Sequence, residues 1–182
     1  MIRTKDILDE KDPRVRAKNS DVEFPLCNEY KNIIPEMLKH LRYSQIEKLS
    51  KKYDLRPGMG LAAPQLGINK NFFVVCYEVK EGVFDDYILI NPKIVSYSEE
   101  MIYAGEGEGC LSVNREVEGI VPRHARITVE AYDIDGKKHK YRVREDLAIA
   151  FQHELDHLNG ILFVDYIDPK DPYKDADIYR EI

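Results

Sequence analysis

The sequence predicts an α+β fold, with mixed or antiparallel β-sheets packed around one late helix. Helix-like segments come first, strand-like runs follow, and a single helical segment returns near the end. The chain has 182 residues, of which 43% are hydrophobic and 33% charged. This length suffices for one sizeable core and is short for two, so we expect a single domain over residues 1–182, with its core at about 12–168.

The first half predicts helices separated by a loop. Asp12-Pro13 combines an N-cap residue with a proline at the first helical position, which predicts a short helix over 13–18. Apolar residues at three- and four-residue spacing predict an amphipathic helix over 28–52, or two helices with a break. Pro35 should lie in a first turn or cause a kink. Glycines and prolines crowd 56–67, so we expect no regular element there.

The second half predicts strands and then a helix. The strand-like runs are 72–79, 86–91, 93–97, 126–133 and 138–144. Asp135-Gly136 predicts a tight hairpin turn between the last two runs. Helical spacing returns from Leu147 to Leu158, and Asn159-Gly160 ends it. The polar, acidic tail 165–182 is expected to lie on the surface or to be partly loose.

Composition argues against several classes of function. The 27 Lys and Arg residues against 33 Asp and Glu give a net charge of −6, unlike the basic surface of a nucleic-acid groove. The longest apolar run covers only 72–77, whereas a membrane helix needs about 20 residues. The N-terminus is charged from Arg3 onward and shows no apolar segment typical of a secretory signal. Three widely separated cysteines favour a reducing compartment, so we expect a cytoplasmic protein.

The strongest local signal is His153-Glu154-Leu155-Asp156-His157, within the late predicted helix. Histidines four residues apart project from one helical face, so both imidazoles can reach a single metal ion. Glu154 is close enough to that face to handle a proton without binding the ion. Two solvent-facing histidines are the alternative interpretation, but the many apolar residues of this helix predict a buried position and favour a metal site.

A catalytic metal needs about three protein ligands and one open position. Asp165 and Asp168 follow the helix closely in turn-like sequence. Upstream, Cys110 lies among glycines, where the backbone can approach a ligand and a thiolate would be a soft donor. An inert thiol in a glycine-rich turn is the alternative for Cys110. These residues by themselves leave the third ligand open.

Three separated motifs resemble the peptide deformylase family: Gly58-Met59-Gly60-Leu61-Ala62-Ala63-Pro64-Gln65, Glu108-Gly109-Cys110-Leu111-Ser112 and Gln152-His153-Glu154-Leu155-Asp156-His157. Their order and spacing agree with the family, and the similarity extends from Asp12-Pro13 to about residue 168. The stretch from Cys110 to Arg123 and the short tail resemble the type 2 class, typical of Gram-positive bacteria. The resemblance implies removal of the formyl group from N-formylmethionine of nascent polypeptides, with release of formate.

The resemblance also implies the roles of individual residues. By motif position, Cys110, His153 and His157 hold one divalent metal ion, with Fe²⁺ expected and Ni²⁺, Co²⁺ or Zn²⁺ able to occupy the site. Glu154 is the general base and acid for the metal-activated water. The Gln65 side chain and the Leu111 backbone N–H stabilise the oxyanion. A turn residue that caps loop carbonyls is the alternative interpretation of Gln65.

Five residues are expected on the substrate side of this site. Gly58 and Gly60 would let the backbone approach a peptide that binds as an added strand. Ile149 and Ala150 share the metal-facing side of the helix and would help to wall a slot for the methionine side chain, with Met59 across it. Ordinary core packing is an equally good interpretation of Ile149.

Two further expectations concern the surroundings of the metal helix. Asp156 points away from the metal face, and we expect it to pair with Arg123 as a brace. The family usually has a glycine and then an apolar or aromatic residue just before this helix, whereas this chain has Glu145 and Asp146. Asp146 is expected to be the N-cap, at some expense to the apolar rim of the methionine pocket.

Two other functions compete with the deformylase hypothesis. A zinc endopeptidase uses the same H-E-x-x-H pattern, but the block 108–112 argues against it. A metal-stabilised binding module without turnover would more often close its metal with four protein ligands, and it would leave Glu154 without a purpose. The expected partners are N-formylmethionyl nascent peptides and a transient ribosome contact, with no nucleic-acid readout, no membrane and a monomeric state.

Overall fold

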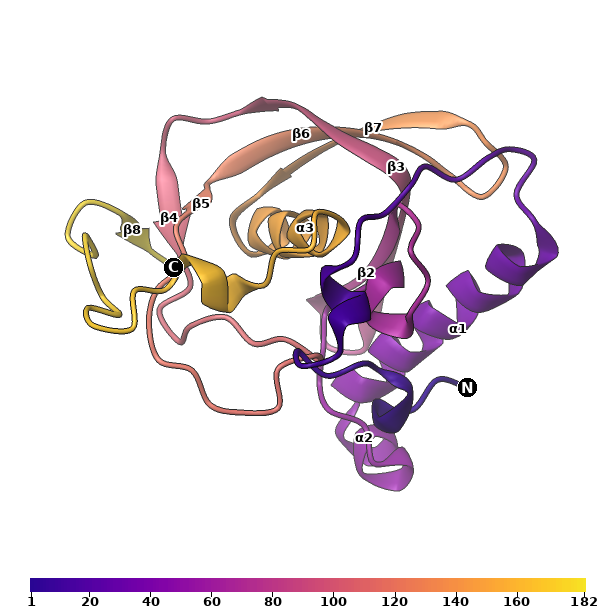
Figure 1. Ribbon diagram of the computed structural model, residues 1–182, viewed down its shortest axis with the longest axis horizontal. Coiled ribbons are helices and arrows are strands. Elements are labelled where there is room, and N and C mark those ends of the chain that lie inside the picture. The colour runs from indigo at the N-terminus through magenta and orange to yellow at the C-terminus, as the bar shows by residue number, and fades with distance from the viewer.

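The computed structural model describes residues Met1 to Ile182 and has an α+β fold, in which β-sheets surround helix α3 (Glu145–Leu158) (Figure 1). One sheet has the order β1-β2-β3-β6-β7 and is antiparallel throughout. Its strands are β1 (Gly60–Ala62), β2 (Phe72–Lys80), β3 (Val83–Tyr97), β6 (Arg126–Tyr132) and β7 (Lys138–Arg144). The other sheet is mixed, in the order β5-β4-β8, with strands β5 (Arg123–His124), β4 (Met101–Tyr103) and β8 (Arg180–Glu181). The predicted fold class is confirmed.

Two helices precede the sheets, α1 (Asn28–Gln45) and α2 (Glu47–Tyr53). They are separated at Ile46, whose backbone is extended, so the two-helix alternative for 28–52 is confirmed. Pro35 lies inside α1, and the expectation of a first-turn position is wrong. The neighbouring residues Ile34 and Met37 are buried in the core that α1 forms with β2. We attribute the tolerance of Pro35 to this burial, which offsets the lost backbone hydrogen bond.

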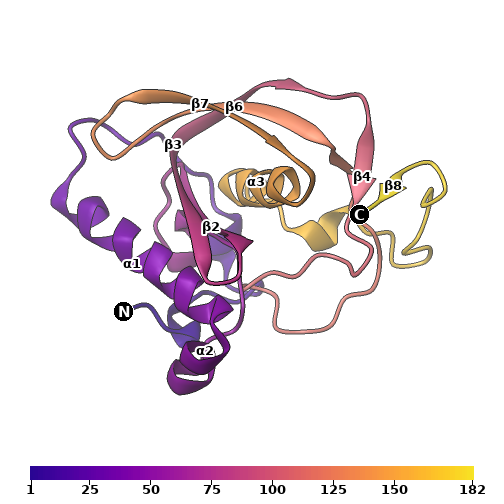
Figure 2. The same ribbon diagram turned by 180° about the vertical axis from the view of Figure 1, so that it is seen from behind.

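Strand β2 separates two parts of the core because its side chains alternate between its faces. Phe72 and Val74 pack with the residues of α1, whereas Phe73 and Val75 pack with Phe151 of α3. Figures 1 and 2 show the result from opposite sides: α1 lies outside the curved sheet and α3 lies within it. Helix α3 is therefore enclosed, as its apolar composition predicts, and every residue that it directs inward is shielded from solvent.

Several short elements differ from the prediction. The four 3₁₀ turns are Thr4–Asp6, Pro13–Arg16, Ala63–Leu66 and Phe163–Tyr166. The second replaces the helix expected at 13–18, although the Asp12 side chain caps it by accepting the Arg14 N–H at 3.0 Å. The segment 56–67 is not wholly irregular, because pairing with β2 makes a strand of β1. Such pairing is a tertiary effect that glycine and proline content does not exclude.

The predicted strands are confirmed, with differences in where they begin, end and connect. The runs 86–91 and 93–97 form the single strand β3, whose register shifts between Ile90 and Lys93, on either side of Asn91-Pro92. The tight hairpin turn predicted at Asp135-Gly136 is confirmed, because the Gly136 N–H donates to the Asp133 carbonyl at 3.1 Å within the connection 133–137. Strands β4, β5 and β8 had no sequence signal. The tail lies on the surface, as expected, and its end pairs with β4 as β8.

Helix α3 begins earlier than expected, at Glu145, and ends before Asn159 as predicted. Arg144 occupies the N-cap position, so the prediction that Asp146 caps the helix is wrong. The Glu145 N–H donates to the Ala125 carbonyl at 3.0 Å, and this bond to β5–β6 fixes the start of the helix one residue before Asp146. No helix in the structure combines the length and the apolar character needed to cross a membrane.

Candidate active site

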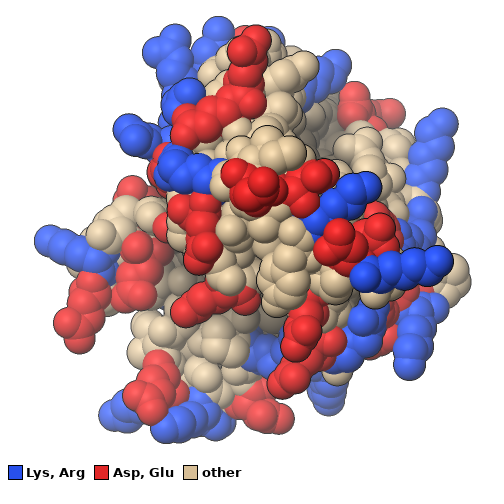
Figure 3. Space-filling view, turned by 90° about the vertical axis from the view of Figure 1, so that its left-hand side faces the viewer, with Lys and Arg blue, Asp and Glu red and all other residues tan.

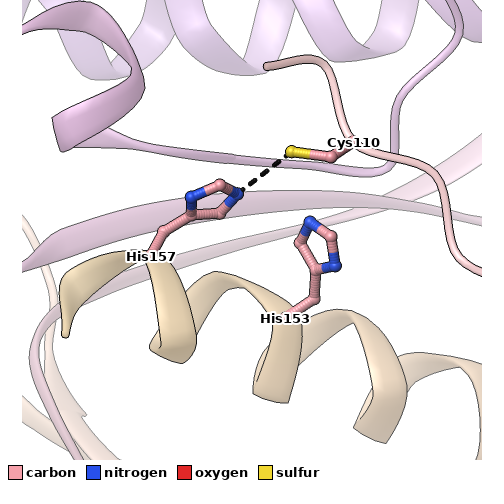
Figure 4. A group of neighbouring side chains, drawn as sticks. All are labelled: Cys110, His153 and His157. Carbon is pink, nitrogen blue, oxygen red and sulfur yellow. Dashed lines mark hydrogen bonds between the residues drawn. The ribbon is translucent and has the colours of Figure 1, made fainter. Parts of the chain in front are cut away.

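The structure brings together a thiol and two imidazoles from distant parts of the chain. His153 and His157 lie one turn apart on α3, and Cys110 comes from the segment between β4 and β5 (Figure 4). All three are buried, and their ligand atoms lie within 4.8 Å of one another. The Cys110 Sγ and the His157 Nε2 are 3.3 Å apart. Sequence spacing had left the third ligand open, and the geometry now favours Cys110.

The two acidic alternatives serve other purposes. The Asp165 carboxylate pairs with Arg16 and accepts the Leu162 N–H at 2.9 Å. Asp168 accepts the Lys170 N–H at 2.9 Å, in the exposed turn that follows. Both side chains therefore stabilise the segment after α3 and do not join the cluster of Cys110, His153 and His157.

The orientation of His153 is fixed by a chain of charged groups. Its Nδ1 lies 2.7 Å from Glu108 Oε2, which leaves Nε2 free to bind a ligand. Arg123 donates to both Glu108 oxygens, at 2.7 and 2.9 Å, and to Asp156 at 2.5 Å. Tyr166 completes the chain by donating its hydroxyl to Asp156. The predicted pair of Arg123 and Asp156 is therefore present, and Glu108 links it to His153.

Burial and pairing set the ionisation of this chain. Burial alone would raise the pKa of Glu108, but its bonds to Arg123 and His153 outweigh that effect and lower the pKa to about 2. Burial likewise opposes the charge of Arg123, while Glu108 and Asp156 raise its pKa. An ionised Glu108 then accepts the proton on His153 Nδ1. A ligating histidine typically has such a support, which fixes the tautomer that presents Nε2 to the metal.

His153 and His157 have opposite electrostatic surroundings. Burial disfavours the charged form of His153, but the bonds to Cys110 and Glu108 are stronger and raise its pKa. Burial lowers the pKa of His157, and the Nδ1 atom of His157 has no partner. A neutral His157 suits metal binding, because the imidazole must offer a lone pair.

Glu154 lies beside the ligands without joining them. It is buried, and its Oε2 has no hydrogen-bond partner. Burial raises its pKa to about 7. A Cβ atom on Gly60 would lie only 2.2 Å from Glu154 Oε1, so the approach of the two segments requires a glycine at this position. A carboxyl group with such a pKa can both accept and return a proton near neutral pH.

Two hydrogen-bond donors point into the same region. Gln65 accepts the Ala62 N–H through Oε1 at 2.8 Å, so its Nε2 faces Ser112 Oγ at 3.1 Å and Cys110 Sγ at 3.6 Å. Gln65 thus caps a backbone N–H and not the loop carbonyls of the alternative interpretation, and its amide nitrogen also approaches the Cys110 thiol. The Leu111 backbone N–H donates to no protein group.

These groups line a pocket of about 350 Å³. All five residues predicted on the substrate side line it: Gly58, Met59, Gly60, Ile149 and Ala150. Asp146 also lines it and is exposed, as expected of a residue at the rim. Sequence reasoning gave no role to Glu108, although its position two residues before Cys110 in the same motif was a signal.

The donor set fits a divalent transition metal. A thiol and two imidazoles, all buried and converging, are ligands that iron, cobalt, nickel and zinc accept. Three protein donors leave a coordination position open, which is typical of catalytic sites. The structure therefore supports a metal-binding site for a single ion at Cys110, His153 and His157.

Comparisons with known proteins agree with this geometry. Residues 4–173 match the polypeptide deformylase family. The chain is 47% identical to a peptide deformylase of Oceanobacillus iheyensis, over 95% of this chain and 94% of that protein. It is 49% identical to a peptide deformylase of Macrococcus caseolyticus, over 96% of this chain and 95% of that protein. Both organisms are Gram-positive bacteria, as the type 2 resemblance implies.

Solved structures show the same fold. The peptide deformylase of Thermus thermophilus superposes with a TM-score of 0.75 at 30% identity, covering 94% of this chain and 89% of that one. The peptide deformylase of Thermotoga maritima gives a TM-score of 0.71 at 32% identity, with coverages of 90% and 97%. Sequence, fold and the buried ligand cluster thus agree that the chain belongs to the polypeptide deformylase family.

Proposed function

We propose that the pocket beside α3 removes the formyl group from the N-formylmethionine of nascent polypeptides and releases formate. Membership of the family makes the chain a metal-dependent hydrolase of such peptides. The observation that carries the proposal is the buried cluster of Cys110, His153 and His157, of which Cys110 and His153 line the same pocket as the unpartnered Glu154 carboxylate. A zinc endopeptidase or a binding module without turnover would not account for the whole of this arrangement.

Cys110, His153 and His157 would hold one metal ion, which we propose to be Fe²⁺, with Ni²⁺, Co²⁺ or Zn²⁺ able to replace it. The donor set suits all four ions, and affinity alone would not select iron. When bound, such an ion supplies Lewis-acid chemistry that lowers the pKa of a water molecule to about 7. Iron beside a thiolate makes Cys110 prone to oxidation in air.

Glu154 would handle the protons of the reaction. It would accept the proton of the attacking water and later deliver one to the leaving amine. Its buried position keeps competing water away from the carboxylate, and its pKa of about 7 matches both tasks. Negative charge develops on the formyl oxygen, and the Gln65 amide and the free Leu111 N–H would stabilise it.

The substrate backbone would bind along β1. This strand is an edge of its sheet, since it pairs only with β2. A peptide can therefore add as a further strand, with Gly58 and Gly60 permitting close approach. The methionine side chain would enter the slot formed by Met59, Ile149 and Ala150.

We also propose that residues 1–182 act as one deformylase domain. Ile2 and Ile7 belong to the core beside α1, and Ile182 packs against residues of α3 and β4, so both ends of the chain contribute to packing. A cytoplasmic, monomeric enzyme with a transient ribosome contact is the setting that suits a nascent-chain substrate.

The first experiment measures formate release from a formyl-Met dipeptide by anaerobically purified, iron-loaded protein. Wild type should release formate rapidly, and Cys110→Ala and Glu154→Ala should not. Glu154→Ala should still bind metal, which separates the proton-transfer role from metal binding. A folded, metal-replete wild type that releases no formate would overturn the proposal.

The metal proposal has its own measurement. Iron-loaded protein should lose activity in air faster than nickel-loaded protein, because only the iron promotes oxidation of Cys110. The half-lives of the two preparations in air and under argon provide the comparison. Equal half-lives in air would contradict this prediction.

A further inference from the structure

The last residues of the chain lie directly behind one wall of the pocket. Strand β8 runs parallel to β4, with Arg180 beside Ile102. The Ile182 N–H donates to the Tyr103 carbonyl, and the Gly105 N–H donates to the Ile182 carbonyl, each at 3.0 Å. The chain continues from β4 into Ala104, which lines the pocket. Figures 1 and 2 both show the C-terminus at β4, close to α3.

The side chain of Ile182 also supports the part of the pocket lining that α3 provides. It packs against a small buried cluster formed by Ile102, Ala125 and Ile149. Ile149 lines the pocket from α3, and the partly buried Ala104, which also lines the pocket, packs against the same cluster. Both pocket walls at this end therefore depend on the position of β8.

Arg180 fastens β8 to the two elements that carry these walls. Its Nη1 and Nη2 atoms donate to the two oxygens of Glu145, at 3.0 and 2.8 Å, and its Nε donates to Glu100 at 2.8 Å. Glu145 is the first residue of α3, and Glu100 immediately precedes β4. A guanidinium that bridges two carboxylates in this way also fixes their relative orientation.

Glu145 adopts a backbone conformation that favours glycine. Its φ is 53°, in the left-handed region that side chains disfavour. A glycine would adopt this conformation freely, but it would leave Arg180 with Glu100 alone. The only polar partner of the Glu145 side chain is Arg180. The contact with Arg180 thus explains why a glutamate, and not a glycine, occupies this strained position.

The surface around β4 and β8 carries no large patch of one charge, so a general electrostatic role for Arg180 is not favoured. The side of the molecule with β4 and β8 faces the viewer in Figure 3, where acidic and basic side chains are interspersed. Arg126 also pairs with Glu100, at 2.6 Å, but it makes no bond to Glu145 or to β8. The chain therefore contains a second arginine on the same carboxylate, which serves as a matched control.

We propose that Arg180 and Glu145 form a clasp that sets the width of the methionine slot by holding Ile182 against the cluster behind Ile149. The clasp touches no reacting atom, so both are positioning residues that act on substrate selectivity. This inference rests on the proposed deformylase function. Its expected signature is a change in the preference for a large first side chain, without a change in the chemical step.

The test compares formyl-Met and formyl-Ala peptides that are otherwise identical. In Arg180→Gln and in Ile182→Ala, KM for the formyl-Met peptide should rise about three- to tenfold, with kcat unchanged, because only slot contacts weaken. KM for the formyl-Ala peptide should not change. Arg180→Lys keeps the positive charge but lacks the paired N–H donors of the guanidinium, so it should recover part of the preference for the formyl-Met peptide. Arg126→Gln should behave like wild type.

A second readout does not depend on turnover. Amide hydrogen exchange at Gly105, whose N–H bonds to Ile182, should be faster in Arg180→Gln and unchanged in Arg126→Gln. If the wild type releases formate but Arg180→Gln keeps the wild-type preference and exchange rate, the clasp proposal is wrong. An equal loss of kcat with both peptides would also overturn it. Absence of formate release by wild type would instead overturn the proposed function, with the exchange experiment still deciding on the clasp.

Discussion

Helix α3 is held near each end by an arginine that bridges two carboxylates, and the two arrangements differ chiefly in burial. Near the C-terminal end, Arg123 joins Glu108 to Asp156 and is only 3% exposed. At the N-terminal end, Arg180 joins Glu100 to Glu145 and is 46% exposed. The same geometry therefore occurs once in a low-dielectric interior and once in solvent.

This difference in burial determines how much each arginine bridge can contribute to the stability of the fold. Removing one partner of a buried pair leaves an uncompensated charge, which is strongly destabilising. An exposed pair is screened by water and salt and contributes little to stability. We therefore expect the Arg123 group to matter for folding and metal binding, and the Arg180 group to matter through the geometry of the pocket.

The largest effect, a loss of folding stability, is expected for Arg123→Met. It leaves the buried Glu108 carboxylate and the partly buried Asp156 carboxylate without their cation, so the free energy of unfolding should fall by about 3–5 kcal/mol. Urea unfolding of the apoprotein measures this change without a contribution from the metal. Arg126→Met, a surface substitution three residues further along, is the control. Equal stabilities for the two variants would break the comparison.

The second-largest effect, a loss of metal affinity, is expected for Glu108→Gln. The amide has nearly the shape of the carboxylate but carries no charge to hold the proton on His153 Nδ1. Metal affinity should fall by about ten- to a hundredfold, the usual consequence of losing such a support. Competition with a chelator, followed by metal analysis, measures it. Glu106→Gln, an exposed neighbour, should keep the wild-type affinity.

A smaller effect is expected at the rim of the pocket. Asp146→Leu supplies the apolar residue that is usual in the family and removes an exposed carboxylate from the pocket mouth. We expect kcat/KM for formyl-Met peptides to rise a few-fold, mostly through KM, since His153, the nearer ligand on α3, lies about two helical turns from Asp146. Steady-state formate assays test this prediction. A fall in kcat at unchanged metal content would show that Asp146 supports the chemistry instead.

The smallest effect is the pH dependence of the exposed arrangement. The hydrogen bond from Arg180 lowers the pKa of Glu145 below its ordinary value near 4.5. A carboxylate with a lowered folded-state pKa stabilises the fold above its unfolded-state pKa and loses that contribution as the pH falls through the folded-state value. The slight stability difference between wild type and Arg180→Gln should thus shrink as the pH falls below 4.5. Thermal unfolding at pH 7 and pH 3.5 measures it, and an undiminished difference at pH 3.5 would argue against the ion pair.

The comparison also shows how far sequence reasoning reaches. The two histidines were predictable because their contact is local: residues four apart on a helix share a face whatever surrounds them. Cys110 was open on spacing alone and depended on the resemblance of three motifs. Glu145 and Asp146 were recognised as a departure, but the cap assigned to Asp146 was wrong, because the hydrogen bond from the Glu145 N–H to the Ala125 carbonyl decides where α3 begins.

By itself, the sequence determined the α+β class, the long strands, the helix that carries H-E-x-x-H and, through its motifs, the family. Periodicity and local geometry carry this information over many residues. Only the tertiary structure decided the two- and three-residue strands β4, β5 and β8, which have no period and exist through their pairing. The same holds for the bridge made by Arg180 and for the link from Arg123 to Glu108, which join residues distant in sequence, whereas the pair of Arg123 and Asp156 was predicted from the sequence.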